Sequence, residues 1–415
     1  MATVEDGGSA GANRLSPVRF VLAFGVVSLL ADFVYEGARA IIGPFLATFG
    51  ASALVVGLVT GLGEAAALVT RPWTGRLSDR TGRHWALSIG GYALTLVAVP
   101  LLGAAQALWQ AAGLVVAERF GKAVRTPARD TMLAQASTRI GRGRAFAFHE
   151  ALDQTGALVG PLLVAAMVAI SGFRLGFAVL AVPGVLALLA IARLRRAVPT
   201  PTAYETDPHE PAPRGQPADP PRAPRGQPTH LPPATMGFSH RFWLYAAFTA
   251  LSVGGYATFG VLSYHLEVRH VVSAALIPVI YAAAMGIDAL AALGSGYLYD
   301  RFGLRGLVLL PILTALVPFW SFSTSPAWVW AGALGWGAAM GIHESTMRAA
   351  VADLVPTQRR GTGYGVFTAV YGLAWLAGST AIGALYGASL TWVFVFVVTL
   401  QALALAAFVP LANPR

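Results

Sequence analysis

The stretch GRLSDRTGRH at residues 75–84 decides the fold, because it returns as GYLYDRFGLR at residues 296–305. Each copy lies between two long apolar runs. Each must therefore form a short polar hairpin that joins two helices at a membrane face. Because the two hairpins lie about half the chain apart, we expect two related halves.

The glycines of the two hairpins have separate expected roles. Gly75 and Gly296 remove side chains where two helices close on each other. Gly82 and Gly303 each permit a turn with φ above zero, which other residues adopt with strain. The hairpins are thus predicted to combine tight helix packing with a sharp reversal.

The pattern Gly-x-Leu-x-Asp-Arg-x-Gly followed by a base resembles the loop between helices two and three of the major facilitator superfamily. The second copy is a weaker echo and resembles the loop between helices eight and nine. The resemblance implies a cytoplasmic gate formed by the four glycines with Asp79, Arg80, Arg83, Asp300 and Arg301. The aspartates can accept from the N-terminus of a neighbouring helix or pair with arginine. Alternatively, these residues only mark the turn and fix topology.

Composition places the chain in a membrane. Of its 415 residues, 56% are hydrophobic and 12% are charged, which is too little charge to cover a soluble globule of this size. The net charge of +10 gathers in alternate loops, so no nucleic-acid partner is expected. There is no Cys, and no nucleophile and base constellation is visible. We expect neither an enzyme nor a cofactor.

Twelve apolar runs predict an all-α membrane protein with two pseudo-symmetric six-helix bundles. The first bundle spans 19–194 and the second spans 241–410, with tails at 1–18 and 411–415 and a Pro-rich linker at 195–240. The first tail and the linker are predicted to be disordered. The predicted spans are 19–47, 52–73, 84–105, 107–136, 144–170, 173–194, 241–267, 273–296, 304–322, 327–354, 361–387 and 389–410.

Loop charges predict the orientation. The loops after even-numbered helices are rich in arginine, whereas the opposite loops hold only Arg174 and Arg269. Both termini and the linker should therefore be cytoplasmic. We expect a multi-pass monomer in the inner, plasma membrane whose partners are a small-molecule substrate, protons and the lipid bilayer.

A second repeat supports the two halves. RGRAFAFHEALDQTGALVGP aligns with RGTGYGVFTAVYGLAWLAGS, which places Gly160 opposite Gly378. Helices five and eleven are then counterparts, as expected for two bundles that rock about a central site.

Ionisable residues inside the spans carry the functional hypothesis, because each is costly in a bilayer unless it faces a cavity or a partner. Asp32, Glu36 and Arg39 lie within about 60° of each other on helix one. Glu36 and Arg39 are alternatively a structural pair. Asp32 has no partner on its own helix and is predicted to face the cavity.

Helix four carries a basic face. Arg119, Lys122, Arg125 and Arg129 fall within about a third of the helical wheel. The run resembles the helix-four signature of proton-coupled members of the superfamily. Arg119 and Lys122 are therefore predicted to face the cavity, and Arg129 to anchor the helix at the cytoplasmic interface.

Helix five contributes His149 and Asp153, one helical turn apart. A protonatable pair is the preferred interpretation, and a divalent cation in transit is the alternative. The following Gly156, Gly160 and Pro161 resemble the Gly-x-x-x-Gly-Pro motif of drug/proton antiporters. The same glycines also suit close helix packing.

Four further charged positions lie within the predicted spans. Asp288 lies in the middle of helix eight without an opposite charge on that helix, and is predicted to face the cavity. Glu344 and Arg348 on helix ten are predicted to pair with each other. Glu64 on helix two has two open readings, a cavity residue or the partner of a base on another helix.

The resemblance implies alternating access driven by a proton gradient. In our hypothesis, Asp32, Glu36 and Asp153 exchange protons and substrate against Arg119 and Lys122. Export of a small organic solute by antiport is preferred. A net basic lining would instead favour uptake of an organic anion by symport, and a divalent-metal exporter is the third alternative. A membrane sensor or scaffold would bind without transport.

Overall fold

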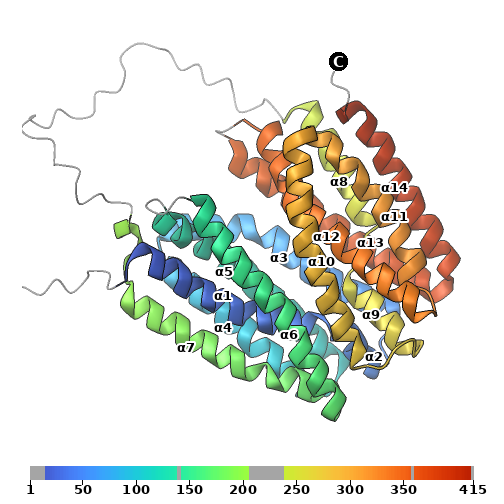
Figure 1. Ribbon diagram of the computed structural model, residues 1–415, viewed down its shortest axis with the longest axis horizontal. Coiled ribbons are helices and arrows are strands. Elements are labelled where there is room, and N and C mark those ends of the chain that lie inside the picture. Colours follow the sequence, from blue (N-terminus) through green and yellow to red (C-terminus); the bar gives the residue numbers. More distant parts are fainter. Residues whose placement is uncertain (1–14, 138–141, 205–237, 357–358, 413–415) are drawn as a thin grey trace, which may run out of the picture.

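The computed structural model describes residues 15–137, 142–204, 238–356 and 359–412. Within them, every regular element is a helix (Figure 1). Eight stretches are long and apolar enough to cross a membrane. Two of these, 148–197 and 276–321, each hold two consecutive spans. Together with α5 and α12 they give the twelve-helix architecture that the sequence predicted.

The first bundle contains seven helical segments for its six spans, because the first span is broken between α1 and α2. A similar break between α8 and α9 interrupts the first span of the second bundle. The segments of the first bundle are α1 (Pro17–Arg39), α2 (Ile42–Thr48), α3 (Ala53–Thr81), α4 (His84–Leu102), α5 (Leu108–Ser137), α6 (Arg142–Val179) and α7 (Ala181–Ala197).

The second bundle repeats this order. Its segments are α8 (His240–Gly254), α9 (Phe259–Val268), α10 (Leu276–Phe302), α11 (Leu309–Ser321), α12 (Pro326–Leu354), α13 (Arg360–Ala388) and α14 (Leu390–Ala412). Two short 3-10 turns, η1 (Pro201–Tyr204) and η2 (Gly303–Val308), complete the described chain.

Serine hydroxyls begin several of the helices. Ser16, Ser52 and Ser239 accept from the backbone N–H three residues later, at 3.4, 3.4 and 3.2 Å, which satisfies a donor that the helix leaves free. Pro17 follows Ser16 at the first helical position, where its missing N–H costs nothing. Local sequence thus specifies where these spans start.

The predicted glycine turns are present. Gly82 ends α3 with a φ of 63°, and Gly303 follows α10 with a φ of 59°. Within α6, non-helical backbone at Ser171 and Gly172 separates the fifth and sixth spans, where Gly172 has a φ of 76°. Each of these turns reverses the chain at a point where an L side chain would be strained.

The edges of the predicted tail and linker are more ordered than expected. Residues 195–197 belong to α7, and the hydroxyl of Tyr204 donates to the Leu15 carbonyl at 2.7 Å. The Trp85 indole donates to the Val198 carbonyl at 3.1 Å. The chain after α7 is therefore folded back onto the start of the first bundle. The rest of the predicted tail and linker lies outside the described residues.

Equivalent glycines pack equivalent helices in the two bundles. A Cβ on Gly156 or Gly160 would overlap the α1 backbone at Leu29 or Phe33. A Cβ on Gly378 in α13 would overlap the carbonyl of Gly254 in α8. The fifth span thus packs on the first as the eleventh packs on the seventh. This correspondence bears out the alignment of the second repeat.

Gly160→Val should destabilise the fold, because its side chain meets backbone that cannot move away. The expected loss is about 1–3 kcal/mol, seen as a lower thermal unfolding midpoint of the purified protein. Gly113→Val in α5 is the matched control, since no atom lies within 4 Å of a Cβ built there. Equal midpoints for the two variants would contradict the packing role.

The bundles meet tightly at the end of the molecule away from the chain termini (Figure 1). The backbone of Gly43 in α2 lies against the Gly260 carbonyl in α9. The hydroxyls of Thr60 and Thr258 are 2.7 Å apart across the same seam. Gly57 in α3 lies against the Ser379 carbonyl in α13. This end is closed to passage by direct backbone contact.

Candidate functional site

A cavity lies between the bundles, toward the face that bears the termini. It has a main chamber of about 380 Å³ and a side chamber of about 60 Å³. Both chambers are lined by Arg39, Arg71, Lys122, Met340 and Glu344, so they form one space. The first bundle contributes α1, α3, α5 and α6, and the second contributes α10, α12 and α13.

Asp32 faces the main chamber, as predicted, and its partner is on another helix. Its carboxylate lies 3.4 Å from the guanidinium of Arg125 on α5. Arg125 is only 1% exposed and also stacks 4.7 Å from the Tyr92 ring centroid. The sequence placed Arg125 on the basic face of this helix but gave it no role. The structure makes it the counter-ion of the candidate proton-binding residue.

Asp153 forms a second pair with α5. Its carboxylate lies 3.5 Å from Arg129 and 3.6 Å from Nε2 of His149. The same His149 nitrogen is 3.4 Å from the Ser28 hydroxyl. The predicted His149 and Asp153 pair is present. Arg129 lines the chamber and pairs inward, whereas an anchor at the interface had been expected.

Arg119 does not line either chamber, contrary to the prediction. It is buried behind Tyr35, to whose hydroxyl it donates, and lies 3.1 Å from both Glu64 and Glu118. Glu64 also lies 3.0 Å from Arg39, so this carboxylate holds two arginines. It lines the side chamber as well, so both readings of Glu64 apply.

Arg119 and Lys122 were both predicted to face the cavity, and of these two only Lys122 does so. It lines both chambers, and its Nζ lies 3.7 Å from the Tyr35 ring centroid. Arg119 lies over the same ring, 4.4 Å from the centroid. The ring thus contacts a buried cation and a cation that faces the cavity, and both contacts are favourable.

Glu36 and Arg39 lie where the bundles meet. Their side chains are 3.7 Å apart, which is the structural pair that the sequence allowed. Glu36 also accepts a hydrogen bond from the Tyr281 hydroxyl on α10. The guanidinium of Arg39 is 5.9 Å from the ring centroids of Trp336 and Trp375. Both residues therefore link the first bundle to the second.

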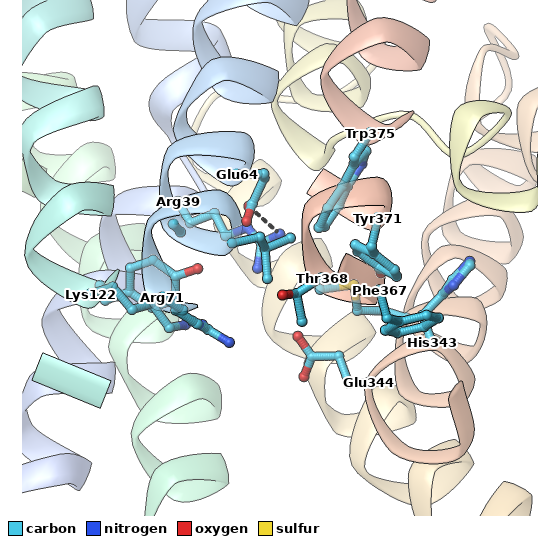
Figure 2. A pocket seen from close by; sticks show the side chains of 14 residues that line it. Arg39, Glu64, Arg71, Lys122, His343, Glu344, Phe367, Thr368, Tyr371 and Trp375 are labelled. Atoms are coloured by element: carbon cyan, nitrogen blue, oxygen red, sulfur yellow. Dashed lines mark hydrogen bonds and ion pairs between the residues drawn. The ribbon is translucent and has the colours of Figure 1, made fainter. Parts of the chain in front are cut away.

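The second bundle supplies an aromatic wall. Figure 2 shows Phe367, Tyr371 and Trp375 on α13, with His343 of α12 nearby, opposite Arg71 and Lys122. Nδ1 of His343 lies 3.1 Å from the sulfur of Met347.

The main chamber is acidic among the described residues, which corrects the expectation of a net basic lining. Seven carboxylates line it: Asp32, Glu36, Asp130, Glu150, Asp153, Asp288 and Glu344. Four bases line it: Arg39, Arg71, Lys122 and Arg129. The expectation failed because Arg119 turns away from the chamber into buried pairs, and because Asp130, Glu150 and Glu344 also line the chamber.

Asp288 is buried and lines the main chamber, as predicted. The predicted pair of Glu344 involves Arg348, whose side chain lies outside the described residues. No group of three or more His, Cys, Asp or Glu side chains in the described chain is placed to hold a metal ion. The His149 and Asp153 pair thus has no third ligand of these types within that part of the chain.

The predicted gate residues are solvent-exposed. Asp79 and Arg80 lie in the last turn of α3, Arg83 follows the end of this helix, and Asp300 and Arg301 lie in the last turn of α10. Within the described residues none of these five forms an ion pair. Both hairpins belong to the side on which the bundles are apart, so their gating role stays a prediction.

The hairpin glycines have room in this arrangement. A Cβ on Gly75 would come no closer than 3.6 Å, to Pro127. A Cβ on Gly296 would come no closer than 3.9 Å, to Ser345. The tight packing predicted for these two glycines is thus not required here, and it would apply when the bundles close on this side.

Arg125→Met should destabilise the protein, because it leaves the Asp32 carboxylate, whose side chain is 15% exposed, without its counter-ion. The loss should be smaller than the about 3–5 kcal/mol expected for a fully buried pair, because this carboxylate faces the chamber. The double variant Asp32→Asn with Arg125→Met removes both charges and should recover much of the thermal unfolding midpoint. Additive effects of the two substitutions would contradict direct pairing.

Two helical bundles around a central cavity with buried charges define a membrane transporter. The Major Facilitator Superfamily model matches residues 24–379, and the chain belongs to this family. Its members are transporters and not enzymes.

An uncharacterized protein of Mycobacterium tuberculosis is 51% identical over 409 residues, covering 98% of this chain and 96% of that protein. The multidrug resistance protein MdtG of Salmonella arizonae is 32% identical over 129 residues, covering 31% of this chain and 32% of MdtG.

Solved structures with the same fold include a bacterial homolog of the human lysosomal transporter Spinster. It was solved in an inward-facing, unoccupied conformation and superposes with a TM-score of 0.70 at 17% identity, covering 95% of this chain and 97% of that chain. The nucleoside transporter NupG superposes with a TM-score of 0.68 at 16% identity, covering 94% and 99%.

Proposed function

We propose that this transporter exports a small organic solute in exchange for protons by alternating access in the inner membrane, with both termini cytoplasmic. One observation carries the proposal. Asp32 and Asp153 both line the chamber, and each pairs with an arginine of the same helix, α5. A carboxylate that faces a cavity and pairs with a base is suited to bind and release a proton.

The coupling follows from these pairs. When Asp32 is ionised, Arg125 neutralises it, and the same holds for Asp153 and Arg129. A proton on Asp32 leaves Arg125 without its ion partner, and a proton on Asp153 leaves Arg129 paired with Asp130 alone. Either proton adds one positive charge to the chamber that receives the solute. Proton and solute thereby bias the same two-state equilibrium from one cavity. Three bases of the first bundle, Arg39, Arg71 and Lys122, line both chambers.

The switch between the two states requires the closed end to open. Glu36 lines the chamber and accepts from Tyr281 across the seam, so it senses cavity occupancy and holds the bundles together. Opening separates this pair, as well as the contact between Thr60 and Thr258. The predicted hairpin gate would then close the opposite side.

Export is the proposed direction for two reasons. The Gly156, Gly160 and Pro161 motif resembles that of drug/proton antiporters, and the partly similar MdtG is named a multidrug resistance protein. Uptake of an organic anion by symport loses its support, because the described lining is acidic.

The test uses purified protein in sealed vesicles that contain a pH-sensitive dye. Solutes are first chosen from a screen for thermal stabilisation at several pH values. Antiport predicts that each transported solute moves against the proton flux and that reversing the pH gradient reverses the solute flux. Flux in the same direction as protons would establish symport. Binding without counterflow would establish a sensor, and metal-stimulated proton release abolished by His149→Ala would establish a metal exporter.

A further inference from the structure

Three carboxylates from both bundles share one space beside the main chamber. A cavity of about 510 Å³ between α6, α10 and α12 is lined by Glu150, Asp288 and Glu344. The same three residues also line the main chamber. The first belongs to the first bundle and the other two to the second, so the group spans the seam that moves during transport.

Gln154 holds two of these carboxylates together. Its amide nitrogen donates to Glu150 at 3.4 Å and to Asp288 at 3.5 Å. Glu150 and Gln154 are one turn apart on α6, whereas Asp288 reaches them from α10. One neutral amide thus lies between two acidic groups. It satisfies one oxygen of each and neutralises neither.

Asp288 is left with an unsatisfied oxygen. Its side chain is 3% exposed, and its Oδ1 has no hydrogen-bond partner among the described residues. No Lys, Arg or His of the described chain forms an ion pair with Asp288 or Glu150. A buried carboxylate in this situation is suited to receive a cation or a proton. Asp32 and Asp153, in contrast, each have an arginine.

The surroundings favour an organic cation over a metal ion. Besides the carboxylates and Gln154, the adjoining cavity is lined by Ala151, Ala289, Ala292, Leu293 and Ser345, so most of the remaining wall is apolar. The described residues bring no three carboxylates close enough for one metal ion. An alkylammonium group has three N–H donors that reach separated acceptors, and its carbon chain fits an apolar wall.

We propose that Asp288, with Glu150 and Glu344, receives the protonated amine of the exported solute. The apolar body of the solute lies in the adjoining cavity between α6, α10 and α12. This inference rests on the proposed transport function and names its substrate class, a monoamine with an apolar body. The site is complete only when both bundles contribute.

Binding of a matched series of probes tests the site without requiring transport. Phenylbutylamine, phenylbutanol and phenylbutanoate share one apolar body and differ in charge. At neutral pH and millimolar concentration, the amine should raise the thermal unfolding midpoint of the purified full-length protein by several degrees. The alcohol should have a small effect and the anion none.

Asp288→Asn keeps the size of the side chain and removes its charge. It should weaken amine binding about tenfold or more while leaving the response to the alcohol unchanged. Glu150→Gln should act in the same direction, and because Glu150 is exposed this variant serves if Asp288→Asn does not fold. Glu267→Gln on α9 is the matched control and should bind the amine normally. Glu267 lines neither of the two chambers nor the adjoining cavity.

The inference is overturned if the amine gives no stabilisation, if the anion stabilises as well as the amine, or if Asp288→Asn binds it as the parent does. The proposed function fails separately. Amine binding that depends on Asp288, without any gradient-driven flux in vesicles, would retain the site and reject the antiporter. Gradient-driven flux of another solute, without any amine binding, would retain the antiporter and reject the amine site.

Discussion

Asp32→Asn is expected to reduce solute transport driven by a proton gradient by about a hundredfold while preserving solute counterflow. Asparagine has the size and polarity of the aspartate but cannot exchange a proton. Arg125 then keeps a neutral neighbour throughout the cycle, 3.4 Å from the position of the carboxylate in the parent. The bundles can still alternate around the solute. The proton gradient, however, no longer biases that motion.

The measurement compares gradient-driven uptake and counterflow in the same proteoliposomes, using a solute from the stabilisation screen. Asp353→Asn is the matched control, because Asp353 is exposed and lies outside the cavity. Full gradient-driven transport by Asp32→Asn, and also by Glu36→Gln, would remove these carboxylates from the coupling mechanism. Loss of both activities together would indicate a failure of solute binding instead.

Joining the bundles at their closed end should stop transport reversibly. The hydroxyls of Thr60 and Thr258 are 2.7 Å apart, so cysteines at both positions are close enough for a disulfide bond. After oxidation, the variant Thr60→Cys with Thr258→Cys should lose transport by about tenfold or more, because this end can no longer open. Reduction should restore transport.

The parent chain has no Cys, so the two introduced thiols are the only ones that can react. Each single substitution is the control and should keep its transport after oxidation. Solute binding from the side of the termini should persist in the oxidised double variant. Transport that survives complete cross-linking would contradict alternating access through this seam.

Hydrophobic runs and repeated hairpins predicted the architecture well, for a physical reason. A spanning helix needs about 20 apolar residues, and loops carry the charges, so the order of spans is visible in the chain. Gly82 and Gly303 were recognisable because a reversal with positive φ favours glycine. These signals are local and do not depend on how the helices turn toward one another.

The cavity lining was only partly predictable, since it depends on the rotation of each helix. Lys122 lies between Arg119 and Arg125 on the wheel of α5, and it alone of these three faces the chambers. The two flanking arginines enter pairs with Glu64 and Asp32 from other helices. No pattern within one helix reveals such partners. The error about net charge came from counting bases without knowing which were already paired.

The contacts across the seam were also beyond the sequence. Glu36 and Tyr281 are far apart in the chain, and neither helix alone suggests that they meet. Gln154 gave no signal, because an amide in a span has many ordinary roles. Asp288 was identifiable because an unpaired acid in the middle of a span is rare.

The two walls of the cavity have different chemical tasks. The first bundle supplies the ion pairs of Asp32 and Asp153, whereas Phe367, Tyr371 and Trp375 of α13 supply flat, uncharged surface. Because separate segments of the gene encode these two walls, mutations can change one wall without changing the other. In the proposed mechanism, a descendant of this protein can acquire a new cargo through changes in the aromatic surface and still inherit the paired aspartates.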